Sequence, residues 1–254
     1  MLRGFCTFLV VASAACGGGV PILMYHSVLP AGHTDPLAMT PEQLDAQLAY
    51  LGQAGFTTVS LHEVLEAEDG HGSLPPHPIV LTFDDGYEEA IQTTLPLLQK
   101  RGQKATFFVV SGFTAADAAH RVHDRKSKRP YLVWNEVRAL HAAGMEIGSH
   151  TVTHGKLTDM TNAALWHEVL QSRLDLQAGL RAPIEFFSYP FTAQRFRVRN
   201  VVVHAGYRGA VVGARGGTDR FELQRITMHA RTSLDDLKAL LSEGWATGYT
   251  TGGG

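Results

Sequence analysis

The chain is poor in cysteine, which excludes several kinds of chemistry. Of its 254 residues only Cys6 and Cys16 are cysteines, and both lie within the first 16 positions. From residue 17 onward the sequence therefore offers neither a disulfide nor a cysteine nucleophile. Internal repeats and low-complexity tracts are also lacking, apart from glycine runs at 17–19 and 252–254. The sequence gives no sign of a repeat architecture.

Neither sign of charge dominates. The 22 lysines and arginines nearly balance the 24 aspartates and glutamates, for a formal net charge of -2. This balance argues against a nucleic-acid partner, whereas a neutral polymer needs no electrostatic attraction. With 44% apolar residues the chain can bury one sizeable core. We therefore expect residues 17–254 to form a single domain, and we expect it to be a monomer.

Long apolar runs are missing as well. The stretch 5–11 is well short of the ~20 residues that span a bilayer. With a basic residue before it and small residues after it, this stretch predicts an export signal over residues 1–16. The sequence Ser13–Gly19 also resembles a bacterial lipoprotein signal with the lipid on Cys16, although Ser13 stands where such signals carry an aliphatic residue. We expect an exported, periplasmic or cell-envelope protein whose only membrane contact would be a lipid anchor at Cys16.

Strand-like and helix-like segments alternate along the rest of the chain. Apolar, β-rich runs predict strands at 20–25, 57–60, 79–83, 105–110, 146–148, 185–189, 209–212 and 225–228. Helical spacing predicts helices at 41–52, 87–101, 134–143, 161–178, 194–205 and 233–243. This alternation indicates an α/β fold with parallel strands and outer helices, closed as a barrel of seven or eight strands. The basic stretch 121–129 falls in a connection, where we expect a solvated loop.

Two groups of metal-binding side chains follow predicted strands. Asp84 and Asp85 come directly after the apolar run 79–81, and His150 and His154 lie about 65 residues later. Adjacent residues at a strand end point in different directions, so one carboxylate can bind a metal while the other handles a proton. Histidines four apart can reach one cation from a helical turn or a tight loop. Two nitrogens and one carboxylate oxygen leave coordination positions open, as catalytic sites do.

These residues stand in motifs that resemble those of a known family. Thr82-Phe-Asp-Asp-Gly86 and Ser149-His-Thr-Val-Thr-His154 resemble the first two motifs of the polysaccharide deacetylases, the family 4 carbohydrate esterases with a NodB-type domain. The resemblance runs from about Pro21 to Leu241 and includes Ser188-Tyr-Pro-Phe191. The opening Leu23-Met-Tyr-His-Ser27 is most similar to the poly-N-acetylglucosamine deacetylase branch. The resemblance implies a distorted barrel, removal of acetyl groups from an N-acetylated polysaccharide, and a divalent metal.

The resemblance also implies roles for the first two motifs. Asp85, His150 and His154 would hold the metal, with Zn2+ expected first and Co2+ or Ni2+ as alternatives, because mixed nitrogen and oxygen ligands discriminate weakly. Such an ion lowers the pKa of a bound water toward ~7 and polarises a carbonyl. Asp84 would be the general base, which a neighbouring cation keeps ionised.

The third motif is expected to stabilise the oxyanion of the reaction. In the family this is done by a backbone NH after the motif's proline, which here is the NH of Phe191. Pro190 shapes the turn and has no NH of its own, and Tyr189 beside it would contact or support the substrate. Thr192 departs from the glycine that relatives carry, which puts the shape of this turn, and hence substrate preference, in question.

The leaving amine needs a proton donor. Most of the family uses a histidine near the carboxyl end of the domain, whereas the poly-N-acetylglucosamine branch has the pattern at the other end, here 22–26. The resemblance therefore implies His26 as the general acid, and a strand-end histidine with no catalytic role is the alternative. His229 is the rival, because it shares a strand face with Arg225, although its polar neighbours favour surface exposure.

A second departure concerns the arginine that normally orients the catalytic aspartate. The family pattern places it in the third motif, where this chain has Ser188. Arg225 is our candidate for the missing arginine, with a purely structural salt bridge as the alternative.

The whole sequence leaves three hypotheses for the function. The first is a deacetylase that acts on N-acetylglucosamine units. The second is an esterase for O-acetyl groups of xylan or an amidohydrolase for a small molecule, and the third is a carbohydrate-binding relative without activity.

Overall fold

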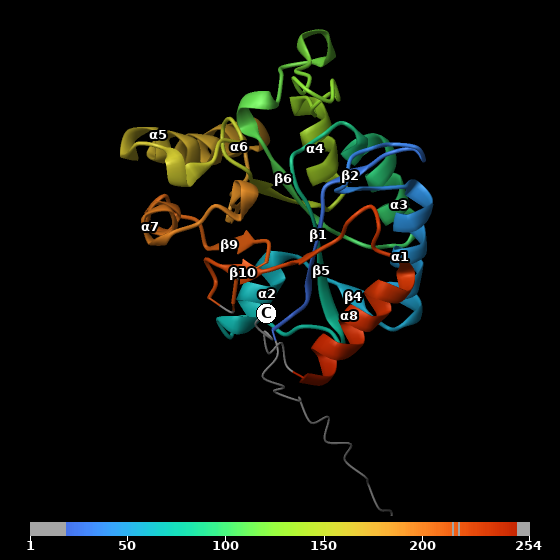
Figure 1. The fold of residues 1–254 in the computed structure, drawn as a ribbon. Coiled ribbons are helices and arrows are strands. Elements are labelled where there is room, and N and C mark those ends of the chain that lie inside the picture. Colours follow the sequence, from blue (N-terminus) through green and yellow to red (C-terminus); the bar gives the residue numbers. More distant parts are fainter. Residues whose placement is uncertain (1–18, 215, 218, 248–254) are drawn as a thin grey trace, which may run out of the picture.

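A parallel sheet that curls into a barrel is the centre of the computed structural model, which describes residues 19–247 except 215 and 218 (Figure 1). Among these residues the sheet follows the order β10, β9, β8, β7, β6, β5, β1, β11, and every pairing along it is parallel. The strands are β1 (Ile22–Tyr25), β5 (Pro78–Phe83), β6 (Thr106–Val109), β7 (Glu146–Ser149), β8 (Phe186–Ser188), β9 (Gly209–Val212), β10 (Leu223–Gln224) and β11 (Ile226–Thr227). The short β4 (Thr57–Thr58) pairs with the start of β5.

One extended segment brings the two edges of the sheet together. Leu223 in β10 pairs with β9, and Ile226 in β11 pairs with β1 at the opposite end of the strand order. The segment that holds both strands therefore nearly closes the barrel, and Arg225 lies between its two halves. The prediction of a distorted (β/α) barrel of seven or eight strands is confirmed.

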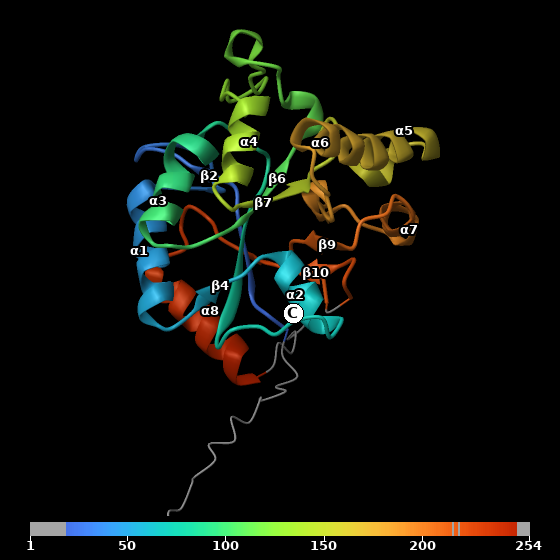
Figure 2. The same cartoon turned by 180° about the vertical axis from the view of Figure 1, so that it is seen from behind.

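Helices surround this barrel (Figure 2). They are α1 (Pro41–Gln53), α2 (Leu61–Glu68), α3 (Leu95–Lys100), α4 (Trp134–Ala142), α5 (Asn162–Trp166), α6 (Ser172–Leu180), α7 (Phe196–His204) and α8 (Leu234–Thr247). Thr40 and Ser60 begin α1 and α2 with capping boxes, in which the N3 side chain returns to the cap residue's NH. A two-stranded ladder of β2 (Ser27–Val28) and β3 (Ala38–Met39) lies beyond β1.

Side chains alternate between the barrel interior and the helix layer, because successive residues of a strand face opposite sides. One buried apolar cluster fills the barrel interior at the end where the strands begin, and α2 covers it there. The cluster consists of Ile22, Val59, Leu61, Val64, Leu65, Val80, Phe108, Phe186, Val211 and Leu223. Gly148 is required there, since a Cβ atom at this position would lie 2.4 Å from the Phe108 ring. Every second residue of a strand faces the interior, and this alternation continues past the ends of β1, β5 and β7. His26, Asp84 and His150 therefore also face inward.

The sequence predicted most elements but not all of them. The predicted strands all contain strand residues, and the helix predicted at 87–101 begins only at Ala90, with a π-helical turn before α3. The helix predicted at 161–178 is α5 and α6 joined by a second π-helical turn. The helix α2 was missed, although Ser60 and Glu63 form its capping box. Its eight residues are too few for helical periodicity to be distinctive.

The predicted export signal at 1–16 and the lipid anchor at Cys16 lie outside the described residues. Within the described part of the chain, no helix combines the length and the apolar character needed to cross a bilayer.

Candidate active site

The site begins where β5 ends. Asp84 continues the inward row of the strand and is buried, with 4% of its surface exposed, and its NH donates to Tyr25 O at 3.0 Å. The chain then turns sharply, since Asp85 has φ +77° and Gly86 φ +72°. This turn changes the direction of the chain between the two carboxylates, whereas the sequence predicted that strand alternation would separate them.

His150 is held in one orientation at the end of β7. Its Nδ1 donates to the carbonyl oxygen of Ser188 at 2.8 Å, and its side chain is buried. A carbonyl can only accept, so Nδ1 carries the proton and Nε2 has a free lone pair in the neutral ring. This is the tautomer that a metal ligand requires.

The turn after His150 brings His154 back toward it. The NH of His154 donates to Thr151 Oγ1 at 2.9 Å, and Thr151 and His154 have φ values of +69° and +55°. Glu168 holds the turn from the side, because its Oε2 accepts from the NH groups of Val152 at 3.0 Å and Thr153 at 2.8 Å. Sequence reasoning missed Glu168, which no motif marks.

The geometry of Asp85, His150 and His154 fits a metal ion. The Nε2 atoms of the two histidines are 3.2 Å apart, and Asp85 Oδ1 lies 3.5 Å from the first and 3.3 Å from the second. A tetrahedral ion with ligands at about 2.0–2.1 Å separates neighbouring ligand atoms by about 3.3 Å. Within the described residues, these three side chains have ligand atoms close enough together to bind one metal ion. Two nitrogens and one carboxylate oxygen suit zinc, cobalt or nickel.

Asp84 is fixed by Arg225, which enters the barrel from the closing segment. Arg225 Nη1 and Nη2 each lie 2.7 Å from one carboxylate oxygen of Asp84, a bidentate pair in which both side chains are at most 3% exposed. Ser188 Oγ lies 3.1 Å from Asp84 Oδ2 and 2.9 Å from Arg225 Nη2. Arg225 thus contacts the aspartate that the family's third-motif arginine normally orients. Ser188, which stands at the position of that arginine in this chain, lies beside it.

The electrostatics keep both carboxylates ionised. Burial alone raises the pKa of Asp84, but the charges of Arg225 and His150 outweigh it and lower this pKa from 3.8 to about 2. For Asp85 burial is again opposed, here by the neighbouring imidazoles of His150 and His154, and its pKa falls well below 3.8. Asp84 Oδ2 is 4.0 Å from His150 Nε2, so this carboxylate borders the candidate metal site without joining it.

His26 lies at the same rim. Burial lowers the pKa of its imidazole, and the smaller opposing effects come first from the charges of Asp84 and Asp85, which places His26 close to both. Its Nδ1 is buried without a hydrogen-bond partner in the described structure. The rival His229 is exposed in a turn, where its NH bonds Thr232 Oγ1. The structure therefore brings His26, and not His229, into the site.

The third motif forms a strained turn beside His154. Phe191 has φ +58° and Thr192 φ +55°, a region that favours glycine. Thr192 compensates with its hydroxyl, which accepts from the NH of Gly213 at 3.2 Å. The Phe191 ring is 66% exposed and lies 4.8 Å from the His154 ring, whereas Tyr189 is 2% exposed with its hydroxyl on Phe221 O. Tyr189 therefore supports the turn and offers no surface to a substrate.

Arg129 joins three segments that surround the site. Its guanidinium stacks on the Tyr87 ring at 3.8 Å from the centroid and bonds Glu89 and Asp35 at 2.9 Å each. It also donates to the hydroxyl of Ser27, the neighbour of His26. The solvated loop predicted for 121–129 is wrong at this residue, whose side chain is 17% exposed, because acidic groups from other segments surround it.

Replacing Arg129 by glutamine is expected to destabilise the protein by about 2 kcal/mol, since hydrogen bonds to charged groups contribute about that much and two carboxylates lose their partner. Arg129→Lys should recover only part of this, because lysine lacks the fork and the stacking plane. Denaturant unfolding measures the change. Arg125→Gln, at the exposed tip of the same loop, is the matched control. Equal stability of the Arg129 and Arg125 variants would contradict the assignment.

Fold and site together define a parallel (β/α) barrel with a two-histidine, one-carboxylate cluster at the carboxyl edge of its strands. The chain belongs to the polysaccharide deacetylase family, because the model of that family matches residues 71–210.

Curated relatives are similar in sequence to this chain, and solved structures share its fold. YxkH of Bacillus subtilis (strain 168) is 26% identical over 79% of this chain and 67% of that protein. The poly-beta-1,6-N-acetyl-D-glucosamine N-deacetylase of Escherichia coli (strain K12) is 32% identical over 45% of this chain, which spans only 18% of that enzyme. Among structures, the Streptococcus pyogenes deacetylase PplD has TM-score 0.77 at 23% identity, over 87% of this chain and 96% of that one. IcaB from Ammonifex degensii has TM-score 0.72 at 21% identity, over 88% and 97%.

Proposed function

We propose that this protein removes N-acetyl groups from N-acetylglucosamine units of an exported polysaccharide and releases acetate. The observation that carries the proposal is the buried Asp84, fixed by Arg225 and bordering the cluster of Asp85, His150 and His154. An ionised carboxylate beside a candidate metal site is the arrangement that metal-assisted hydrolysis requires. The Escherichia coli relative named above supports the substrate class.

Each residue has a distinct part in the proposed reaction. A divalent cation held by Asp85, His150 and His154 supplies an acidified water and a polarised acetyl carbonyl when it is bound. Asp84 accepts the proton of the attacking water, and Arg225 keeps the carboxylate aligned for it. The NH of Phe191 donates to the oxyanion, and His26 gives the leaving amine its proton.

Replacing His26 by alanine is expected to reduce acetate release from N-acetylglucosamine oligomers by about 10²-fold or more, the usual range for a general acid. The rate of hydrolysis of an activated phenyl acetate should fall only slightly, because its phenolate leaving group does not need a proton to depart. The matched control is His229→Ala, which removes an exposed imidazole from the rival position. A His26 variant that loses amide and activated ester hydrolysis equally would show that His26 is not the acid.

The substrate class is tested by comparing N-acetyl and O-acetyl glycans in one release assay. Faster release from N-acetylglucosamine oligomers than from acetylated xylan supports the deacetylase, and the reverse order would replace it with an esterase.

Export and lipidation at Cys16 are part of the proposal. They predict that the protein fractionates with the cell envelope and that Cys16→Ser releases it.

A further inference from the structure

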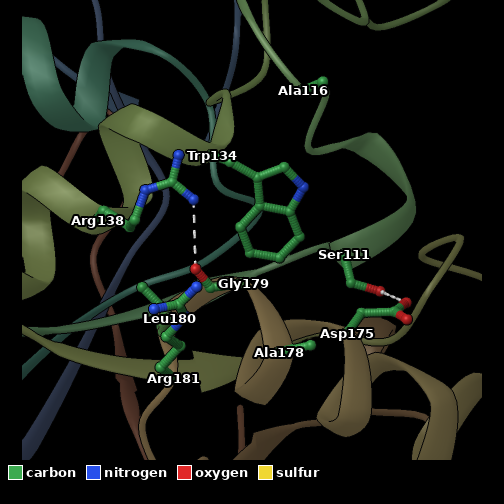
Figure 3. Close-up of a pocket in the computed structure, with 9 residues that line it drawn as sticks. All are labelled: Ser111, Ala116, Trp134, Arg138, Asp175, Ala178, Gly179, Leu180 and Arg181. Atoms are coloured by element: carbon green, nitrogen blue, oxygen red, sulfur yellow. Dashed lines mark hydrogen bonds between the residues drawn. The ribbon is translucent and has the colours of Figure 1, made fainter.

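A second concave site lies outside the reaction centre, between the start of α4 and the end of α6 (Figure 3). Its volume is about 900 Å³. Trp134 stands at its centre, with Arg138 from the same helix on one side and the pair of Ser111 and Asp175 on the other. The proposed reaction uses none of these residues.

The indole of Trp134 is built into this site. Gly179 of α6 lies directly against it, and a Cβ atom on Gly179 would be 2.1 Å from the ring. Arg138 fastens the two helices beside the ring, with Nη1 donating to Gly179 O at 3.3 Å. The ring is partly buried and cannot turn toward α6. A fixed aromatic surface at the wall of a cavity is a binding feature for a flat apolar face.

The charges around the indole have both signs. Arg138 and Arg181 are exposed, and Arg181 reaches the site from the left-handed end of α6, at φ +56°. Asp175 accepts from Ser111 Oγ at 2.9 Å and from Gln171 Nε2 at 2.7 Å. A carboxylate among the lining groups disfavours a simple anion. Donors and an acceptor around an aromatic ring suit an uncharged ligand rich in hydroxyl and amide groups.

This site is joined to the turn of the candidate metal ligands. The NH groups of Ser111 and Gly112 donate to the carbonyls of Thr151 at 3.1 Å and Val152 at 3.0 Å. Gly112 allows this contact, since a Cβ atom there would lie 2.4 Å from Val152 O. The wall of the cavity and the turn that carries His154 are therefore neighbouring chain segments.

We infer that the cavity around Trp134 is a second sugar-binding site, which holds an N-acetylated glycan with a sugar ring against the indole. The guanidinium groups of Arg138 and Arg181 donate to hydroxyl and acetyl oxygens, and Asp175 accepts from a hydroxyl. This inference rests on the proposed function for its ligand class, because the cavity itself selects only an uncharged, polyhydroxylated molecule. The site anchors a long polymer and takes no part in the reaction.

Calorimetry with the N-acetylglucosamine hexasaccharide and the chelator-treated full chain tests this inference without requiring activity. Trp134→Leu is expected to weaken binding about tenfold, the loss that an aromatic contact typically causes. Arg138→Gln with Arg181→Gln, two changes at exposed side chains, should weaken it several-fold. Trp166→Leu, at the exposed tryptophan of α5, is the matched control. Unchanged affinity in both cavity variants, or an equal loss in the control, would overturn the inference.

The metal-supplied protein separates this inference from the proposed function. If the deacetylase is active, the double arginine variant should raise KM for the hexasaccharide several-fold, with kcat and the disaccharide KM within twofold of the original. If no acetate is released with any metal, the proposed function fails, and binding that depends on Trp134 still supports the second site. An active enzyme whose KM is the same for the disaccharide and the hexasaccharide, and is unchanged in the cavity variants, would contradict the second site alone.

Discussion

Asp84→Asn is expected to lower acetate release from N-acetylglucosamine oligomers by about 10³-fold. A general base contributes about 10² to 10⁴ to the rate, and an amide cannot accept the proton. The change leaves Asp85, His150 and His154 untouched, so the metal content of the variant should equal that of the original protein. Asp85→Asn should differ, because it removes a ligand atom and lowers metal affinity.

Metal analysis and rate measurement on the same samples separate these two aspartates. Asp235→Asn, the same chemical change at an exposed carboxylate of α8, is the control and should change neither quantity. An Asp84→Asn variant that retains activity would remove Asp84 as the base. An inactive variant that has also lost its metal would show that Asp84 is a ligand.

Arg225→Met is expected to destabilise the protein by about 3 to 5 kcal/mol. Removing one partner of a buried ion pair leaves the other charge uncompensated, and Asp84 has both oxygens on this guanidinium. The double variant Asp84→Leu with Arg225→Met should regain much of the loss, since an apolar pair of similar volume needs no partner. Denaturant unfolding of chelator-treated samples measures both without a contribution from bound metal.

The same pair predicts a pH dependence. Because the pKa of Asp84 is lowered from 3.8 to about 2 in the folded protein, the pair stabilises the fold fully above pH 4. This contribution is lost as the pH falls from about 4 toward 2. The stability difference between the original protein and Arg225→Met should therefore shrink over this range. A difference independent of pH would show that Arg225 acts only through packing.

The candidate metal ligands could be found from sequence because their positions follow local rules. Asp84 and Asp85 end a buried apolar strand, and His150 and His154 stand at a fixed short spacing after another. Each pair is recognisable within a few residues. The inward rows of parallel strands then bring the pairs to one rim, which is a property of any such barrel.

The supporting residues depend on distant contacts and were harder to find. Arg225 could be proposed, since Ser188 left the position of the family arginine empty, but only the closure of the barrel brings it to Asp84. Glu168 lies in a π-helical turn of an apparently continuous helical stretch, where nothing in the sequence marks it as the acceptor for Val152 and Thr153. Arg129 stood in a basic stretch whose acidic partners come from other segments.

The most direct test of the account is acetate release from N-acetylglucosamine oligomers by the purified protein after chelation and then with added Zn2+, Co2+ or Ni2+. Chelation should abolish release, and at least one of these ions should restore it. No ion should restore release to a variant in which both His150 and His154 are alanine. Release that survives complete removal of metal, or that returns equally in the double histidine variant, would contradict a metal-dependent deacetylase at this site.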